Sequence, residues 1–317
     1  MGSVVFSVDA ELGWGFHDVE APPERLAAAR RGWTTLLDLF DEYDVPATWA
    51  VVGHLLLTAC DGRHEDHPAG PAWFARERGE WRDRPDLRFG PDLVDAVTDA
   101  EAGHELACHT FSHVTFGAET TERVARAELE RCLALADGWK SRMRSFVFPR
   151  NSVGHRGLLA EYGFDAYRGV GPAGPSRTGK VAAALRRPAP RLVTPAVDEF
   201  GLVNVPASLY LYGFQGVARR VVTTALSDPM LEYARAGVDA AAEGDGVFHV
   251  WLHPNDLVEP ADVARLESVL ERVERRRGDL AVETMGEVAT RVIRRPDSRS
   301  AVPDGDRSFG DSPASDA

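Results

Sequence analysis

Short apolar segments of β-strand character alternate with amphipathic helical segments along most of this chain. Alternation of this kind is typical of βα units, which build a parallel sheet or barrel covered by helices. The expected strands lie at residues 4–9, 47–53, 104–109, 145–149, 164–169, 202–208 and 246–253, with a weaker one at 280–285. The expected helices lie at about residues 23–44, 91–103, 120–139, 216–243 and 260–277. The pattern therefore predicts an α/β fold, and 317 residues leave room for one barrel or two smaller domains.

One long segment, residues 60–90, interrupts the alternation and is rich in Asp, Arg, Gly and Pro. It also carries three large aromatic side chains, Trp73, Phe74 and Trp81. Exposed aromatic rings can stack on a sugar, but a loop of this length must also pack against the rest of the domain. We therefore interpret residues 60–90 as an inserted loop and favour packing as the role of its aromatic residues.

Two further segments show little regular pattern. Residues 170–200 are rich in Gly, Pro and Arg, and we interpret them as an irregular excursion. Residues 296–317 carry almost no apolar side chains, so we expect a disordered tail there. The expected organisation is one domain over residues 1–295 followed by that tail.

Charge excludes one class of partner. The formal net charge is -13 at pH 7, and binding to nucleic-acid phosphates needs basic patches, so we expect no nucleic-acid partner. Lysine occurs only at Lys140 and Lys180, while acidic residues are abundant. Concentrated salt screens the repulsion within an acidic surface, so this balance suggests a salt-adapted, halophilic protein.

Cysteine content and the first residues bear on the compartment. Cys60, Cys108 and Cys132 are too few and too scattered for a disulfide framework or a paired-cysteine metal site. The N-terminal segment has neither the basic region of a signal peptide nor the length of a membrane span. We therefore expect a cytoplasmic protein without a transmembrane segment.

Two acidic residues follow the first expected strand. Asp9 and Glu11 stand two apart in SVDAELGW, so the alternation of a strand places both carboxylates on one face, with Ala10 opposite. Two carboxylates at a buried strand end repel each other and lose hydration. A bound cation on one of them, with the other serving as a base, would relieve that cost. Taken alone, the pair is equally consistent with helix-capping or solvated loop acids.

Two histidines follow the third expected strand in the segment HTFSH. The i,i+4 spacing of His109 and His113 predicts both imidazoles on one side of a helical turn. Two neutral imidazoles and one carboxylate leave coordination positions open for water and substrate, as catalytic zinc, iron, cobalt or manganese sites require. A helix surface can carry the same spacing by chance. The preceding strand and the acid pair after the first strand favour a metal site.

A later histidine completes the candidate set. In WLHPNDL, His253 ends an expected strand, and Pro254 stops the strand pairing. The imidazole should therefore project from the carboxyl-terminal rim, which is where barrel enzymes have their catalytic groups. Such a histidine can donate a proton to a departing amine, or it can simply be bonded within its loop. His249 is expected to be a structural histidine of that kind. We interpret the remaining histidines considered as surface or loop residues: His17, His54, His64, His67 and His155.

Taken in order, the segments SVDAE, ATWAVVG, GHELACHTFSH, SFVFPRN and WLHP resemble the motifs of the polysaccharide deacetylase (NodB-homology) family of carbohydrate esterases, over about residues 3–290. The resemblance implies an irregular (β/α)7 barrel. It also implies that Asp9 is the general base and His253 the general acid. The implied metal ligands are Glu11, His109 and His113. Zinc is the first metal expected, with cobalt, iron, manganese and nickel as further candidates.

Two departures from the family pattern affect these roles. The family commonly has adjacent aspartates in its opening motif, whereas Asp9 and Glu11 flank Ala10, so these two residues could exchange the roles of base and ligand. The third motif, usually Arg-x-Pro-Tyr, appears here as VFPR at 147–150 and lacks the first arginine. The backbone N–H of Arg150 could stabilise an oxyanion, and its guanidinium could orient Asp9 or a substrate carboxylate.

The resemblance implies a metal-dependent hydrolase that removes N-acetyl groups from an amino-sugar glycan or glycan precursor. Two alternatives remain open. One is a metal-dependent hydrolase of another carbon–nitrogen bond in a small molecule, such as a cyclic amide or ureide. The other is a non-catalytic glycan-binding member, against which the complete set of candidate ligands and acid argues.

Overall fold

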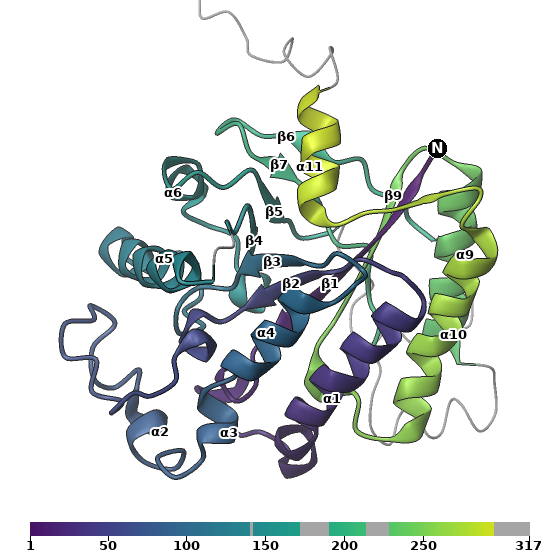
Figure 1. Ribbon diagram of the computed structural model, residues 1–317. Coiled ribbons are helices and arrows are strands. Elements are labelled where there is room, and N and C mark those ends of the chain that lie inside the picture. Colours follow the sequence, from purple (N-terminus) through teal and green to yellow (C-terminus); the bar gives the residue numbers. More distant parts are fainter. Residues whose placement is uncertain (140–141, 172–189, 214–227, 295–317) are drawn as a thin grey trace, which may run out of the picture.

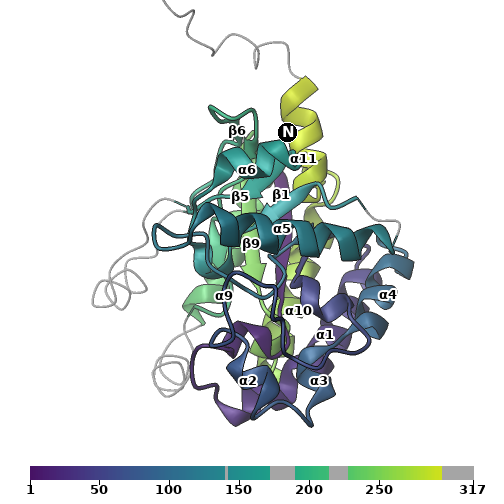
Figure 2. The ribbon, with the colours of Figure 1, turned by 90° about the vertical axis from the view of Figure 1, so that its left-hand side faces the viewer.

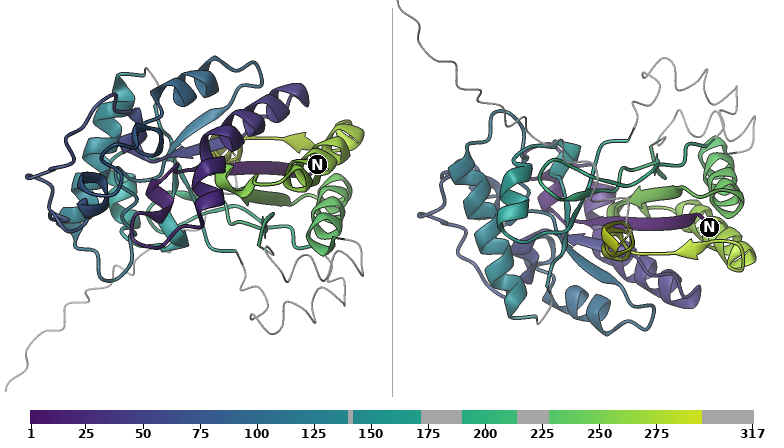
Figure 3. Two further views of the ribbon diagram at one scale, coloured as in Figure 1. Left: turned by 90° about the horizontal axis from the view of Figure 1, so that it is seen from below. Right: turned by 90° about the horizontal axis from the view of Figure 1, so that it is seen from above.

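The computed structural model describes residues 1–139, 142–171, 190–213 and 228–294. Within them, one ten-stranded sheet has the order β6-β7-β5-β4-β3-β2-β1-β9-β8, and β10 pairs with β1. The sheet curls into a half-barrel with helices on its outer side (Figures 1 and 3). The predicted α/β barrel class is confirmed.

The strands are short except for β1 and β9. Their bounds are β1 Ser3–Ala10, β2 Thr48–Val51, β3 Glu105–Cys108, β4 Ser145–Val147, β5 Ala166–Arg168, β6 Ala196–Val197, β7 Val203–Asn204, β8 Leu209–Tyr210, β9 Val247–Leu252 and β10 Ala281–Val282. The pairings are parallel except that between β6 and β7. In a parallel sheet the carboxyl ends of the strands share one rim, so residues that follow β1, β3 and β9 gather there.

The helices connect the strands as βα units require. The α-helices are α1 Pro23–Glu42, α2 Ala75–Arg78, α3 Pro85–Arg88, α4 Pro91–Asp99, α5 Glu122–Asp137, α6 Arg156–Glu161, α9 Pro229–Glu243, α10 Pro260–Arg276 and α11 Met285–Arg294. Short 3-10 turns follow several strands: η1 Trp14–Phe16, η2 Gly53–Leu56, η3 Pro149–Asn151 and η4 Pro254–Asp256. No helix in the described ranges is long and apolar enough to cross a membrane.

Most of the expected elements are present. Each expected strand overlaps an observed one, whereas β6, β8, α2, α3, α6 and α11 were not predicted. The helix expected over 216–243 is observed as α9, where the Asp228 side chain accepts hydrogen bonds from the amides of Met230 and Leu231. The first part of that expected helix, most of the 170–200 excursion and the expected tail lie outside the described residues.

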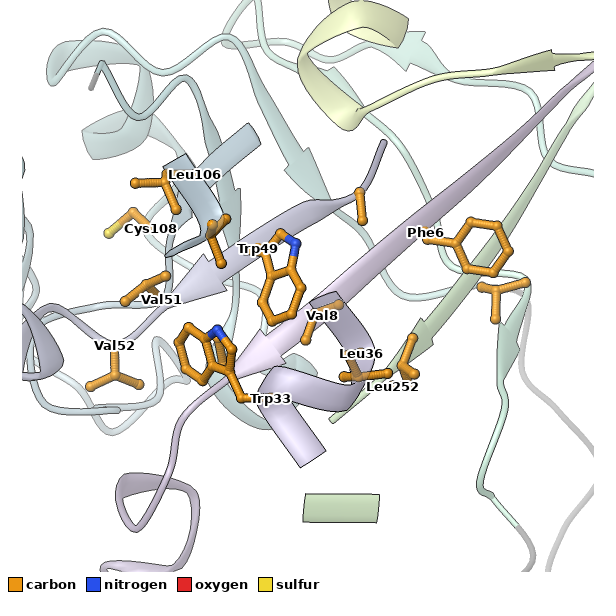
Figure 4. Close-up of a cluster of buried hydrophobic side chains, with 14 of the residues drawn as sticks. Phe6, Val8, Trp33, Leu36, Trp49, Val51, Val52, Leu106, Cys108 and Leu252 are labelled. Atoms are coloured by element: carbon orange, nitrogen blue, oxygen red, sulfur yellow. The ribbon is translucent and has the colours of Figure 1, made fainter. Parts of the chain in front are cut away.

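The main hydrophobic core lies between the sheet and the outer helices. Trp33 of α1 stacks on Trp49 of β2 with ring centroids 5.3 Å apart, beside Val8 of β1 and Leu252 of β9 (Figure 4). All four side chains are fully buried. Burying a side chain of this size contributes about 1.5–3 kcal/mol, so this contact fixes α1 on the strands that carry the candidate site.

Helix α11 packs at the amino-terminal ends of the strands. Its residues Met285 and Val288 are fully buried and join a second apolar cluster with residues of the strands, including Val5. The amide of Met285 donates to the hydroxyl of Thr48, the first residue of β2. Figure 2 shows α11 at the opposite end of the molecule from α2 and α3. The carboxyl-terminal rim is therefore the end available for a site.

The inserted segment of residues 60–90 packs on that rim. Phe74 and Trp81 are buried, as the packing interpretation predicted. Trp73 is partly buried, and its indole N–H lies 3.1 Å from the carbonyl oxygen and 3.0 Å from the hydroxyl of Ser112, inside the HTFSH segment. The insert thus supports the segment that carries two of the candidate ligands.

Candidate active site

Three of the predicted side chains meet at one point of the carboxyl-terminal rim. The Oε1 atom of Glu11 lies 3.1 Å from Nε2 of His109 and 3.0 Å from Nε2 of His113. All three residues are buried, with Glu11 the most exposed at 6%. Their ligand atoms lie within 4.8 Å of one another, so the structure brings the predicted metal set together.

The HTFSH segment is not helical, so the expected helical turn was wrong. Thr110 and His113 have φ values of 61° and 63°, in the left-handed region that non-glycine residues rarely adopt. The segment bends back on itself and returns the imidazole of His113 to the rim. Buried partners hold this bend, because Ser112 donates through its amide (2.7 Å) and hydroxyl (2.5 Å) to the carboxylate of Glu128. Left-handed residues of this kind cost on the order of 1–3 kcal/mol each and concentrate at functional sites.

The chemistry of the three side chains fits a divalent cation. The Nδ1–H of His109 donates to the carbonyl oxygen of Val147 at 2.8 Å, which leaves a lone pair on the Nε2 atom that faces Glu11. Burial raises the pKa of Glu11, but the charges of His113 and His253 and the hydrogen bonds from His109 and His113 together hold it well below its usual range. One ionised carboxylate and two imidazoles match a catalytic zinc site, and also other first-row metals.

Space beside Glu11 depends on a glycine. A Cβ atom at Gly15 would lie 1.8 Å from Oε2 of Glu11, so no larger residue fits at position 15 with the carboxylate in place. Gly15 lies in η1, immediately after β1, and thereby lets the carboxylate reach both histidines.

Asp9 is held by an arginine from another strand. The guanidinium of Arg168, at the end of β5, donates to both carboxylate oxygens of Asp9 at 2.5 and 2.7 Å. Both residues are buried. Burial raises the pKa of Asp9, but the adjacent Arg168 more than offsets this effect, so the pKa lies below its usual value. The guanidinium of Arg168 also donates to Ser7 and Asn151, each at 3.1 Å, and it lies over the ring of Trp251.

Arg150 does not orient Asp9, so that expectation was wrong. Its guanidinium is partly exposed and pairs with the carboxylate of Asp18, and it also lies 3.3 Å from the carbonyl oxygen of Gly15. Arg150 follows a short strand and has a left-handed φ of 53° that turns its side chain to the surface. Two suggested roles stay predictions: that of its backbone N–H at an oxyanion and that of its guanidinium towards a substrate carboxylate.

His253 faces both acids across a short gap. Its Nε2 atom lies 3.9 Å from Oδ2 of Asp9 and 3.9 Å from Oε1 of Glu11. On its other side, Nδ1 lies 3.1 Å from the carboxylate of Asp256, which also accepts the His253 backbone N–H. Burial lowers the pKa of His253, but the carboxylates of Asp256, Glu11 and Asp9 raise it to about 9.

Sequence reasoning missed two residues of this arrangement. Arg168 is a charged residue at the end of an otherwise apolar strand, which is a signal for a rim position. Asp256 stands three residues after His253, the spacing of a capping box, and its other oxygen accepts from Tyr210 at 2.8 Å and from Arg25 at 2.5 Å. The partner of Arg168, Asp9, lies on a strand distant in the sequence, so the pair cannot be recognised from spacing.

The other histidines divide into two groups. His249 is buried, with Nε2 2.8 Å from the hydroxyl of Ser7, so the predicted structural role is confirmed. Three of the histidines interpreted as surface or loop residues are buried: His17, His54 and His67. His17 and His67 do lie in loop segments, whereas His54 lies in η2. A fourth, His64, belongs to the insert, and its side chain is only 5% exposed, whereas His155 is half-buried.

Residues 21–166 match the sequence model of the family described as polysaccharide deacetylase. These residues form a polysaccharide deacetylase domain of the NodB type. The match covers His109 and His113, but it begins after Asp9 and Glu11 and ends before His253, so the candidate site also includes residues outside the matched range. A comparison with curated protein sequences finds no match.

Solved structures show the same fold at low sequence identity. A Mycobacterium smegmatis protein assigned as a polysaccharide deacetylase is 19% identical with a TM-score of 0.61, covering 92% of this chain and 90% of that one. A second, from Pseudomonas aeruginosa PAO1, is 14% identical with a TM-score of 0.58, covering 91% and 89%. Puue allantoinase is 15% identical with a TM-score of 0.56 and the same two coverages.

Proposed function

We propose that this protein is a metal-dependent hydrolase that removes N-acetyl groups from an amino-sugar glycan or glycan precursor. The observation that carries the proposal is the convergence on one carboxylate. Glu11 contacts His109 and His113, while His253 and Asp9 flank the same point. This set offers a cation site, a base and an acid within one small volume.

The cation would be held by Glu11, His109 and His113. When bound there, a divalent metal polarises a carbonyl and lowers the pKa of a water molecule. Zinc is the proposed metal, because two imidazoles and a carboxylate match its catalytic sites.

The remaining side chains divide the proton transfers. The low pKa of Asp9 keeps its carboxylate ionised at neutral pH, and the fork of Arg168 fixes its direction, so Asp9 can accept the proton of the attacking water. The raised pKa of His253 keeps it protonated, so it can donate to the leaving nitrogen. Groups in these roles typically contribute about 10²–10⁴-fold each to the rate.

The deciding experiment measures acetate release. We expect the purified protein with zinc to release acetate from N-acetylglucosamine oligomers or nucleotide-linked N-acetylglucosamine, and His109→Ala to lose both the metal ion held by Glu11, His109 and His113 and the activity. Absence of acetate from all such substrates, with metal content intact, would exclude the deacetylase assignment.

A second candidate is hydrolysis of another carbon–nitrogen bond in a small cyclic amide or ureide. It is favoured by the similarity of this fold to an allantoinase, which is nearly as close as that to proteins assigned as deacetylases. Ring opening of such compounds, followed by chromatography in the same samples, separates the two candidates. Carbohydrate and small-molecule substrates therefore both belong in the first screen.

We also propose that the protein works in a reducing, cytoplasmic environment of high salt. The three cysteines are free thiols, and Sγ of Cys108 lies 3.3 Å from Sγ of Cys132 without a bond. A melting curve in molar KCl tests the salt component, and an unchanged or lower melting temperature would count against it.

A further inference from the structure

A second group of metal-binding side chains lies under the inserted segment, separate from the proposed active site. His54, Cys60, His64 and Glu77 each offer one ligand atom, and these four atoms lie within 4.8 Å of one another. We propose that they bind a structural zinc-type ion that fastens residues 60–90 to the half-barrel. None of the four belongs to the set around Glu11.

The distances between the four side chains match a shared ion. Nε2 of His54 lies 3.0 Å from Oε1 of Glu77, Nε2 of His64 lies 2.8 Å from Oε2 of Glu77, and Sγ of Cys60 lies 3.3 Å from Nε2 of His64. Ligands at about 2.0–2.3 Å from a tetrahedral zinc ion are separated by roughly 3.3–3.7 Å. Small adjustments of the side chains would therefore accommodate the ion.

The orientation of His54 gives an independent indication. The residue is fully buried, and its Nδ1–H donates to the carbonyl oxygen of Arg88 at 3.2 Å, which leaves the lone pair on Nε2. That Nε2 atom has no hydrogen-bond partner in the described part of the chain, although Oε1 of Glu77 is only 3.0 Å away. Close approach without hydrogen-bond alignment is the relation expected between two ligands of one cation.

Cys60 supplies the donor that selects the metal. Its Sγ accepts from the amide of Gly62 at 3.3 Å, and the residue is partly buried. A thiolate with two imidazoles and one carboxylate favours zinc over magnesium or calcium, which prefer oxygen ligands.

An ion-pair network without metal is the competing account. The guanidinium of Arg88 donates to Oε1 of Glu77 at 2.7 and 3.2 Å, and a protonated His64 could complete the charge balance. Arg131 also approaches Nδ1 of His64, at 3.4 Å. This account needs His54 to be protonated as well, which would place two imidazolium groups and one guanidinium around the single carboxylate of Glu77, and it assigns no role to Cys60.

The ion would connect two parts of the fold. His54 lies in η2, directly after β2, whereas the other three ligands belong to the insert. The same insert carries Trp73, which bonds Ser112 in the HTFSH segment. Binding at this second site would therefore hold one wall of the active site in place, and its removal should expose residues 60–90 to proteolysis.

Cobalt reconstitution of the full-length protein tests the proposal, because only this site contains a thiolate. We expect the wild-type protein to bind two equivalents of cobalt and to show a cobalt–thiolate charge-transfer band in the near ultraviolet. Cys60→Ser and His64→Asn should each lose the band and one equivalent. The matched control Cys132→Ala removes a core thiol and should keep both, and His109→Ala should keep the band while losing the other equivalent.

A wild-type protein that binds cobalt without the thiolate band would overturn the proposal and leave the ion-pair network as the correct account, whatever the variants do. Unchanged metal content in a folded Cys60→Ser protein would have the same consequence. If instead Glu11, His109 and His113 do not bind a metal ion, the measurements give a different pattern. The wild type would then hold one equivalent with the band, and His109→Ala would leave both unchanged.

Discussion

Arg168 at the end of β5 donates hydrogen bonds to both carboxylate oxygens of Asp9 at the end of β1, at 2.5 and 2.7 Å, and both residues are buried. The segment VFPR at 147–150 places no guanidinium on Asp9, and the arginine that contacts it comes from the next strand. A bidentate fork fixes the direction of a carboxylate, which a lysine cannot do.

Substitution of Arg168 should change the acid side of the pH–rate profile. Arg168→Met removes the charge that lowers the pKa of Asp9, so burial then raises that pKa and activity is lost at a higher pH than in the wild type. Arg168→Lys should keep much of the charge effect but lose the fork, so kcat falls with a smaller shift. Profiles of kcat/KM measure both changes. Arg144→Met, which breaks only an exposed pair with Asp165, is the control, and an unshifted acid limb in Arg168→Met would contradict the assignment of Asp9.

The alkaline side of the profile should depend on Asp256. Its carboxylate is the largest of the effects that raise the pKa of His253 to about 9, so Asp256→Asn lowers that pKa and the protonated acid is lost at a lower pH. The alkaline limb of the kcat/KM profile should therefore shift to lower pH. Tyr210→Phe removes only a hydroxyl that donates to the other oxygen of Asp256 and should shift the limb much less. Equal shifts in the two variants would argue against His253 as the general acid.

Metal affinity should depend on Gly15. The Cβ of Gly15→Ala would meet Oε2 of Glu11 at 1.8 Å, so the carboxylate must leave its place between His109 and His113. Displacement of a supporting group typically costs about 10–100-fold in metal affinity. Competition with a fluorescent chelator measures this loss, and Gly278→Ala, where a Cβ meets nothing within 4 Å, serves as the matched control. Equal affinity in both variants would mean that Glu11 is not a ligand.

Stability should depend on the buried face of α11 without affecting metal binding. Met285 is fully buried, so Met285→Ala should cost about 2–5 kcal/mol of unfolding free energy. Ile293 lies on the same helix with 43% exposure, and Ile293→Ala should cost far less. Urea unfolding gives both values, and elemental analysis should find unchanged metal content in each variant. A similar loss in the two proteins would contradict the packing of α11 described above.

The sequence predicts the parts of this fold that depend on local pattern. Apolar runs located the strands, and the acids and histidines that end them could be grouped because parallel strands share a rim. Local spacing did not predict the contact between Arg168 and Asp9, since curvature of the sheet brings those strands together. The spacing of His109 and His113 fits a helical turn and a left-handed bend equally well, and only the buried carboxylate of Glu128 decides between them. Burial of His54 was equally hidden, because the insert that covers it lacks a periodic apolar pattern.

The place of β1 in the sheet has a consequence for synthesis of the chain. This strand is made before the other described strands. Its two main neighbours are β2, which follows soon, and β9, where the contact between Ser7 and His249 spans 242 positions. The ribosome must therefore synthesise nearly the whole described domain before the strand that leads to Asp9 and Glu11 can pair with a neighbour on each side. Until then the two acids lack His253, and the nascent chain holds an unpaired apolar edge that a chaperone would recognise.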